Sequence, residues 1–321
     1  MPRIETPAQL LGAIRDFAAA RAGTEPGRGW LARAPPAAGR YRSGVTAPRV
    51  ILVSDTHLSP TAPQAQANWE AVLRYVETAV PDLVIHLGDL ALDGAHDPSD
   101  LRHGRQQLDR LPVPWHAVPG NHDVGDNPLP GFPADYAVNA GRRQRWLDII
   151  GTDHWSLATG DWTLLAINAQ LLGSGLEAEA AQWSWLEQQA SQPAGNQIAL
   201  ITHKPVVSTD AEMATSPPYR FLPPASRDRL ADLFRDRPLA LVMSGHVHQY
   251  RRLRLNGAEH LWAPTTWAVL PDEAQPVFGA KRCGIVTLDL VAGPPPQPRF
   301  VAPDGIAQLT MGRDLPDPYH R

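Results

Sequence analysis

Short apolar runs recur along this chain from Arg49 onward, and most of them end in residues that bind metals or carry protons. Runs of four to six apolar residues without alternation are typical of strands buried on both faces of a sheet. The runs lie in RVILVSDTH, DLVIHLGD, VPWHAVPGNHD, WTLLAINAQ, QIALITHKP, LALVMSGHVH, HLWAPTTW and CGIVTLDL. Any fold of this chain has to bury these strands together, which predicts a central sheet structure.

Helical patterns separate most of these runs. They lie at residues 64–80, 99–111, 141–150, 177–190 and 226–236. Alternating strands and helices predict an α/β fold with more than one layer. We place the main domain at residues 49–321, and we expect residues 1–48 to form a helix over 7–21 followed by an irregular linker.

Charge and composition restrict the partners. A formal net charge of −4 argues against bulk attraction to nucleic acid or to an anionic membrane. Cys283 is the one cysteine, so the chain has no internal disulfide and fits a reducing compartment. No apolar run approaches the roughly 20 residues of a membrane helix, and charged residues interrupt the N-terminus where a secretory signal would lie. The sequence predicts a cytoplasmic protein that acts on a small molecule, and a homo-oligomer stays open.

Polar residues follow five of the apolar runs at the same kind of place. They are Asp55 and His57, Gly88 and Asp89, Gly120 to Asp123, His203, and His246 with His248. Each motif alone has an ordinary interpretation, such as a polar loop, a Gly-Asp turn or a histidine in the core. Sites in α/β sheets form at the carboxyl ends of strands. The order of the motifs, each behind a strand pattern, therefore favours one shared site.

The residue types at these strand ends suit a particular class of metal. Two carboxylates, one amide oxygen and several imidazoles favour divalent Mn, Fe, Co or Zn over Mg²⁺ or Ca²⁺. One ion cannot use so many ligands, but a carboxylate can bridge two ions. Two ions about 3.5–4 Å apart can clamp the attacking and leaving oxygens of an in-line displacement. The predicted cofactors are two divalent transition-metal ions, and the predicted reaction is phosphoester hydrolysis. His246 and His248 could face the same way at a strand end and share an ion, or lie on a solvated loop.

In this order, DTH, GD, GNHD, H and GHVH resemble the motifs of the calcineurin-like metallophosphoesterase superfamily. The resemblance covers about residues 49–290. It implies a four-layer fold, in which two mixed β-sheets form a sandwich flanked by helices. It also implies hydrolysis by in-line attack of a hydroxide that bridges two metals.

The resemblance also implies a role for each residue of the motifs. Asp55, His57 and His248 would hold one metal, Asn121, His203 and His246 would hold the other, and Asp89 would bridge them. His122 would contact the phosphoryl oxygen and protonate the leaving group. Asp123 would orient His122 or raise its pKa. On this assignment His246 and His248 serve neighbouring ions.

Departures from related families narrow the branch. Leu92 stands where purple acid phosphatases have a tyrosine, and GDLALDG with GNHD replaces the GDxxDRG and GNHE of protein serine/threonine phosphatases. The phosphate-gripping arginine of those phosphatases is therefore not at its expected place. The chain is most similar to class III cyclic-nucleotide phosphodiesterases and related bacterial phosphodiesterases. This predicts small phosphodiesters or cyclic nucleotides as substrates.

Three alternatives remain. A phosphomonoesterase or a nuclease could use the same site, although the net charge of −4 does not favour DNA. A non-catalytic scaffold is disfavoured, because no ligand position is substituted and a cluster of ionisable groups is costly to keep. Long loops should select the substrate, with Tyr136, Tyr219, Arg220 and Phe221 as candidates for stacking a base or gripping a phosphate oxygen, or else for packing the loop. Trp183 and Trp185 are expected to pack.

Overall fold

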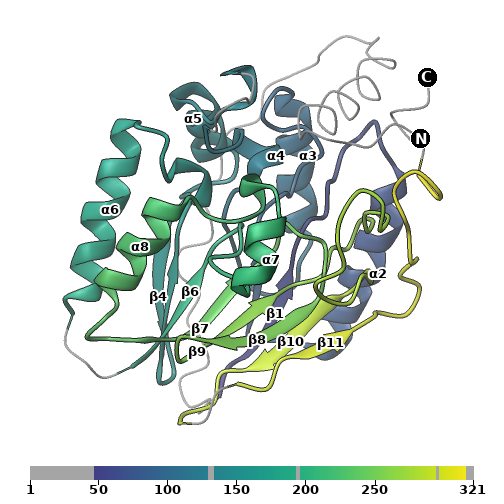
Figure 1. The fold of residues 1–321 in the computed structure, drawn as a ribbon. Coiled ribbons are helices and arrows are strands. Elements are labelled where there is room, and N and C mark those ends of the chain that lie inside the picture. Colours follow the sequence, from purple (N-terminus) through teal and green to yellow (C-terminus); the bar gives the residue numbers. More distant parts are fainter. Residues whose placement is uncertain (1–46, 129–133, 193–195, 294–295, 316–321) are drawn as a thin grey trace.

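The computed structural model describes residues 47–128, 134–192, 196–293 and 296–315 (Figure 1). The helix expected over residues 7–21 and almost all of the expected linker lie outside this part of the chain. Within the described residues, no helix combines the length and the apolar character needed to cross a bilayer.

Two mixed sheets form the centre of the molecule. The first sheet has the strand order β11-β10-β1-β2-β3, with β1 (Arg49–Val53), β2 (Leu83–His86), β3 (Trp115–Ala117), β10 (Ile285–Asp289) and β11 (Arg299–Val301). The second sheet has the order β4-β5-β6-β7-β9-β8, with β4 (Trp155–Thr159), β5 (Trp162–Ala166), β6 (Gln197–Ile201), β7 (Leu239–Ser244), β8 (Arg251–Leu255) and β9 (Ala258–Trp262). Parallel pairing dominates each centre, because β1, β2 and β3 run parallel, as do β5, β6, β7 and β9.

Helices cover the outer face of each sheet, which makes four layers (Figure 1). One core cluster joins the first sheet to α2 (Gln64–Ala79), α3 (Pro98–Leu108) and α5 (Ala140–Ile149). A second cluster fills the space between the sheets, with Leu52 and Ile85 from one side and Ala199 and Leu241 from the other. A third joins the second sheet to α6 (Glu177–Ala190) and α8 (Pro224–Leu233), and it includes Trp183. The expected α/β sandwich is therefore confirmed.

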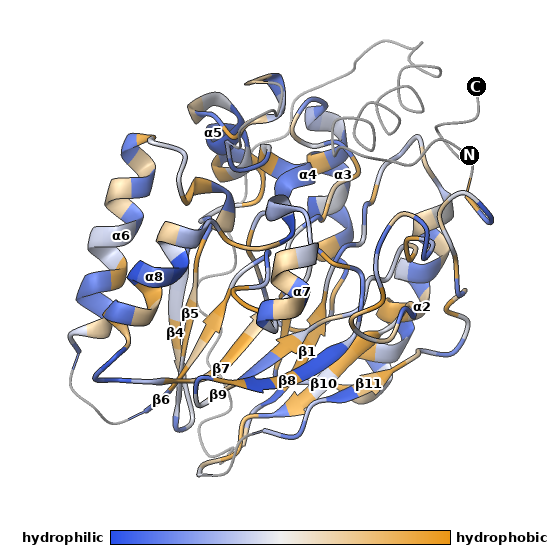
Figure 2. Cartoon of the chain, viewed as in Figure 1, coloured by the Kyte–Doolittle hydropathy of each residue, from blue (hydrophilic) through white to orange (hydrophobic). Residues whose placement is uncertain are grey.

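Burial explains which strands the sequence revealed. The last four residues of β1 are buried and form a continuous apolar run (Figure 2). Every residue of β2 is buried as well, and all but His86 are apolar. The edge strand β4 has exposed positions between buried ends, β8 alternates between half-buried and exposed positions, and β11 is short. Both β4 and β8 carry polar side chains. Edge strands avoid long apolar faces because these would pair with other chains. The sequence patterns therefore missed β4, β8 and β11.

The remaining short helices lie in the loops near one edge of the sandwich. They are α4 (Asn121–Val124), α7 (Asp210–Thr215), and the 3₁₀ turns η1 (Ala134–Tyr136), η2 (Ala169–Leu171) and η3 (Pro218–Arg220). The registers Val53 with His86, His86 with Ala117, and Ile201 with Met243 align the carboxyl ends of the parallel strands. The polar residues behind these strands consequently emerge at one edge.

Candidate metal centre

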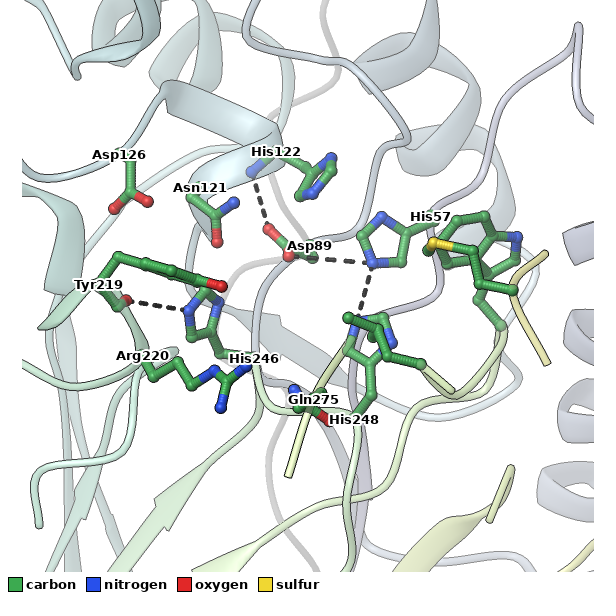
Figure 3. Close-up of a pocket in the computed structure, with 13 residues that line it drawn as sticks. His57, Asp89, Asn121, His122, Asp126, Tyr219, Arg220, His246, His248 and Gln275 are labelled. Carbon is green, nitrogen blue, oxygen red and sulfur yellow. Dashed lines mark hydrogen bonds and ion pairs between the residues drawn. The ribbon is translucent and has the colours of Figure 1, made fainter. Parts of the chain in front are cut away.

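Five of the seven candidate ligands line one pocket (Figure 3). Asp89 lies in the middle, with Asn121 and His246 on one side and His57 and His248 on the other. The backbone N–H of His246, from the second sheet, donates to Asp55 Oδ2 of the first sheet over 3.0 Å. This bond joins the two strand ends across the sandwich.

The first group of side chains surrounds His248. Ligand atoms of Asp55, His57 and His248 all lie within 4.8 Å of one another, and all three residues are buried. His248 Nε2 is 3.3 Å from Asp55 Oδ1 and 3.2 Å from His57 Nε2. Three side chains that share one point in this way can hold a cation.

The second group surrounds His203. Its Nε2 lies 3.3 Å from Asp89 Oδ2, 3.2 Å from Asn121 Oδ1 and 3.2 Å from His246 Nδ1. Asp89 Oδ2 is also 3.9 Å from His57 Nε2 in the first group, while Asp89 Oδ1 accepts from the backbone N–H of His122 over 2.8 Å. One carboxylate oxygen therefore faces both groups, which supports a bridging position for Asp89.

Hydrogen bonds to backbone carbonyls show which ring nitrogens face the centre unprotonated. His203 Nδ1 donates to Leu87 O over 2.8 Å, and His248 Nδ1 donates to Ala268 O over 2.7 Å. His246 Nε2 donates to Tyr219 O over 3.1 Å. A carbonyl only accepts, so the other nitrogen of each neutral ring carries a lone pair. His203 Nε2 and His246 Nδ1 thus face each other, and a metal ion between them would take a lone pair from each neutral ring. The donor set fits the predicted pair of transition-metal ions.

Electrostatics favours a cation at the same place. Burial lowers the pKa of His57 and of His246 well below the usual value, helped by repulsion from neighbouring imidazoles, so both rings are neutral. Burial also lowers the pKa of His203, but attraction to Asp89 outweighs it and raises the pKa to about 9. A proton and a metal ion compete for such a group.

Five of the candidate ligands have left-handed backbone conformations. Their φ angles are 52° for Asp55, 45° for His57, 53° for Asp89, 69° for His246 and 52° for His248. This region costs a non-glycine residue roughly 1–2 kcal/mol, and it persists only where the surrounding structure enforces it. Because β7 ends at Ser244, the alternation of a strand does not govern His246 and His248. His246 turns to His203, whereas His248 turns to His57.

Close packing of Gly245 against Asp55 leads to a prediction. A Cβ at Gly245 would overlap Ser54 Oγ and lie 2.7 Å from Asp55 Oδ2. We expect Gly245→Ala to displace Asp55, to lower metal content at the Asp55 group, and to reduce the free energy of unfolding by about 1–3 kcal/mol. Elemental analysis and urea unfolding measure both effects. Gly141→Ala is the control, because its Cβ would meet only Asn139 Oδ1 at 3.4 Å. Full metal content in Gly245→Ala would show that Asp55 tolerates the shift.

His122 and Asp123 differ in their relation to the centre. His122 Nδ1 donates to Leu92 O over 2.7 Å, so its Nε2 is the nitrogen left to act in the pocket that it lines. The carboxylate of Asp123 instead accepts from backbone N–H groups of Leu90, Ala91 and Gly120 at 2.8–3.2 Å. The expectation that Asp123 orients the ring of His122 is therefore wrong, because the Leu92 carbonyl does so. Burial and repulsion from Asp89 raise the pKa of Asp123 itself to about 7.

Sequence reasoning missed several residues that line the pocket. Trp267, Leu270 and Met311 make an apolar wall on one side, and Gln275 lies nearby. The wall comes from chain positions far from the five motifs, so no local pattern connects it to the site. Asp126 also lines the pocket and forms a buried ion pair with Lys204. In the sequence, the one available signal for Lys204 was its position directly after the predicted ligand His203, in HKP.

The four loop residues that the sequence suggested as substrate contacts lie in different environments. Tyr219 and Arg220 line the pocket. Phe221 instead packs with Val247 and Trp262 in a small core cluster, and the ring of Tyr136 lies 6.1 Å from that of His96. Trp183 packs in the core, and Trp185 packs against the same cluster, as expected.

Known proteins that resemble this chain include a family model, curated relatives and a solved structure, all named for the cleavage of phosphoesters. A family model described as calcineurin-like phosphoesterase matches residues 48–250. A protein of Arcobacter nitrofigilis named probable glycerophosphodiester phosphodiesterase GpdQ is 27% identical over 214 residues, which are 62% of this chain and 71% of that protein. The serine/threonine-protein phosphatase CPPED1 of Bos taurus is 28% identical over 203 residues, 57% of this chain and 61% of that protein. The purple acid phosphatase PPD1 of yellow lupin superimposes with a TM-score of 0.55 at 17% identity, covering 76% of this chain and 49% of that one.

Proposed function

Because this chain belongs to the calcineurin-like phosphoesterase family and is thus a phosphoester hydrolase, we propose that it cleaves small phosphodiesters at a centre of two divalent metal ions. The observation that carries the proposal is that ring nitrogens of His203 and His57 face the single oxygen Asp89 Oδ2, with those of His246 and His248 directly beside them. An arrangement of this kind has little purpose without cations.

The residues that would hold the ions fall into two sets joined by Asp89. Asp55, His57 and His248 would hold one ion, and Asn121, His203 and His246 would hold the other. Such ions supply Lewis-acid activation of the phosphoryl group and of water. The carbonyl oxygens of Leu87, Ala268 and Tyr219 accept hydrogen bonds from His203, His248 and His246, in that order. These bonds keep the three imidazoles in the tautomers that metal binding requires.

His122 is the candidate general acid. Its backbone is held by Asp89 Oδ1 and its ring by Leu92 O, so both its position and its tautomer are defined. Nε2 would give its proton to the departing oxygen as the P–O bond breaks. Asp123 would act indirectly, by holding the backbone of the Leu90–Ala91 and Gly120 loops together.

The lining of the pocket supports a small diester, because it combines metal-ligand candidates with apolar side chains. The apolar wall of Trp267, Leu270 and Met311 gives a second ester group a surface to contact. The GpdQ relative is named as a diesterase, and cyclic nucleotides belong to the same substrate class.

A phosphomonoesterase is the second candidate, and Arg220 favours it. An arginine is absent from the GDxxDRG position, but Arg220 reaches the pocket from a different loop. A guanidinium suits the dianion of a phosphomonoester. The CPPED1 relative is named as a phosphatase.

A direct substrate comparison tests the proposal. We expect faster hydrolysis of bis(p-nitrophenyl) phosphate than of p-nitrophenyl phosphate by the Mn-loaded enzyme, measured as kcat/KM at one pH. A panel of cyclic nucleotides and glycerophosphodiesters then narrows the class. Chelator-treated protein is the control and should lose both activities. A preference for the monoester would assign the protein to the phosphatase branch instead.

A further inference from the structure

Arg220 is a buried cation, and no carboxylate of the described residues forms an ion pair with it. It belongs to η3, lines the pocket near His246, and is only 4% exposed (Figure 3). Its Nε and Nη1 are buried and have no hydrogen-bond partner within the described chain, and its Nη2 makes one long contact of 3.4 Å with Ala274 O. Burying a guanidinium with so few partners is costly, so its position calls for a ligand.

The acids that line the pocket have other partners. Asp89 accepts from the His122 backbone and faces His203, and Asp126 pairs with Lys204. Over the described residues, no carboxylate lies within ion-pair distance of Arg220. The guanidinium lies 5.9 Å from the centre of the Tyr219 ring, and no described carboxylate neutralises its charge beside the pocket.

The loop that carries Arg220 is anchored on both sides. Near its start, Glu212 accepts from Arg251 Nη1 over 2.8 Å, and the Arg251 guanidinium lies 5.0 Å from the centre of the Trp262 ring. After Arg220, Phe221 packs against the same tryptophan. These contacts hold the loop, and with it the guanidinium of Arg220, at the pocket.

We propose that Arg220 binds an anionic oxygen of the substrate's phosphoryl group and thereby makes the pocket a receptor for tetrahedral oxyanions. This inference rests on the proposed phosphoesterase function. The free Nε–H and Nη1–H supply donors that a phosphate oxygen can accept, and hydrogen bonds to charged groups are the strong ones. The Tyr219 carbonyl accepts from His246, so the backbone beside Arg220 also contacts a candidate ligand.

The charge of the ligand should decide how much Arg220 contributes to its binding. A monoester or inorganic phosphate carries a second negative charge that a diester lacks, and the attraction to a guanidinium grows with that charge. Arg220 should therefore contribute more to binding phosphate and monoesters than to binding diesters. The residue would set how much monoesterase activity accompanies the proposed diesterase activity.

Inorganic phosphate is the probe for this inference, in calorimetric titrations of the metal-loaded protein with metal content measured in parallel. We expect Arg220→Met to weaken phosphate affinity roughly 10- to 100-fold at unchanged metal content. Arg220→Lys, which keeps the charge but not the planar donors, should lose less. KM for p-nitrophenyl phosphate should rise more than KM for bis(p-nitrophenyl) phosphate. Arg229→Met is the matched control, because Arg229 lies on α8 and pairs with Glu187.

Thermal unfolding without phosphate separates binding from a structural role. Removing an unpaired buried charge should leave the Tm of Arg220→Met equal to or above that of the wild type. A lower Tm together with unchanged phosphate affinity would make Arg220 structural and overturn the inference. If the wild type binds phosphate through Arg220 but hydrolyses no ester, the proposed function fails while this inference stands. If the wild type is active and Arg220→Met binds phosphate normally, the inference alone fails.

Discussion

Asp89→Ala is expected to reduce metal content from about two ions per chain to less than one, and to abolish hydrolysis. Oδ2 of Asp89 faces His203 at 3.3 Å and His57 at 3.9 Å, so one substitution removes a ligand from both proposed ions. Two-ion catalysis needs both positions filled. Elemental analysis of purified protein and a phosphodiester assay measure the two effects.

Two further variants test whether the loss of both ions is specific to Asp89. His57→Ala should mainly affect one ion, because His57 contacts the Asp55 group. Asp153→Asn is the matched control, since the Asp153 side chain is buried like that of Asp89 but pairs with Arg143 away from the pocket. It should keep both ions. Full metal content in Asp89→Ala would rule out the bridging role.

His122→Ala should keep the metals and the fold but lose roughly 10²- to 10⁴-fold in rate, the usual contribution of a positioned acid. The loss should depend on the leaving group. An alkoxide or a ribose hydroxyl must be protonated as it departs, whereas a nitrophenolate leaves without a proton. We therefore expect a large loss of kcat on alkyl esters and a small one on nitrophenyl esters.

Metal analysis and two substrate types separate the alternatives for His122. His116→Ala is the control, because His116 stacks on Trp155 with its ring centre 4.7 Å away and does not line the pocket. Equal losses on both substrate types would mean that His122 stabilises phosphoryl charge and gives no proton. Loss of metal would mean that His122 is a ligand, which its place near His57 and Asp89 permits.

Much of the fold could be predicted because burial leaves a local trace. Strands covered on both faces, such as β1, β2 and β7, appear as apolar runs, and amphipathic helices such as α2 appear by their period. Edge strands are half exposed, so β4 and β8 lack this trace. The four-layer order itself came from the family resemblance and not from any pattern in the residues.

The candidate site could be predicted to the level of which residues meet. Asp55, Asp89 and His203 each follow a buried parallel strand, and the carboxyl ends of such strands share an edge. That the same edge receives His246 and His248 follows from the same rule. The family motifs then supplied the division of these residues between two ions, which metal analysis has to test.

By itself, the sequence determined the strands, the helices that cover them and the set of polar residues at the strand ends, because these depend on neighbours in the chain. The tertiary structure decided what each side chain faces. It placed the Leu92 carbonyl, and not Asp123, on the ring of His122. It turned His246 and His248 apart through left-handed backbones, and it brought Arg220 into the pocket with Nε and Nη1 unpaired within the described chain. The physical reason is that these contacts join residues from different strands and loops. Their geometry is set by how the two sheets pack, which no local pattern encodes.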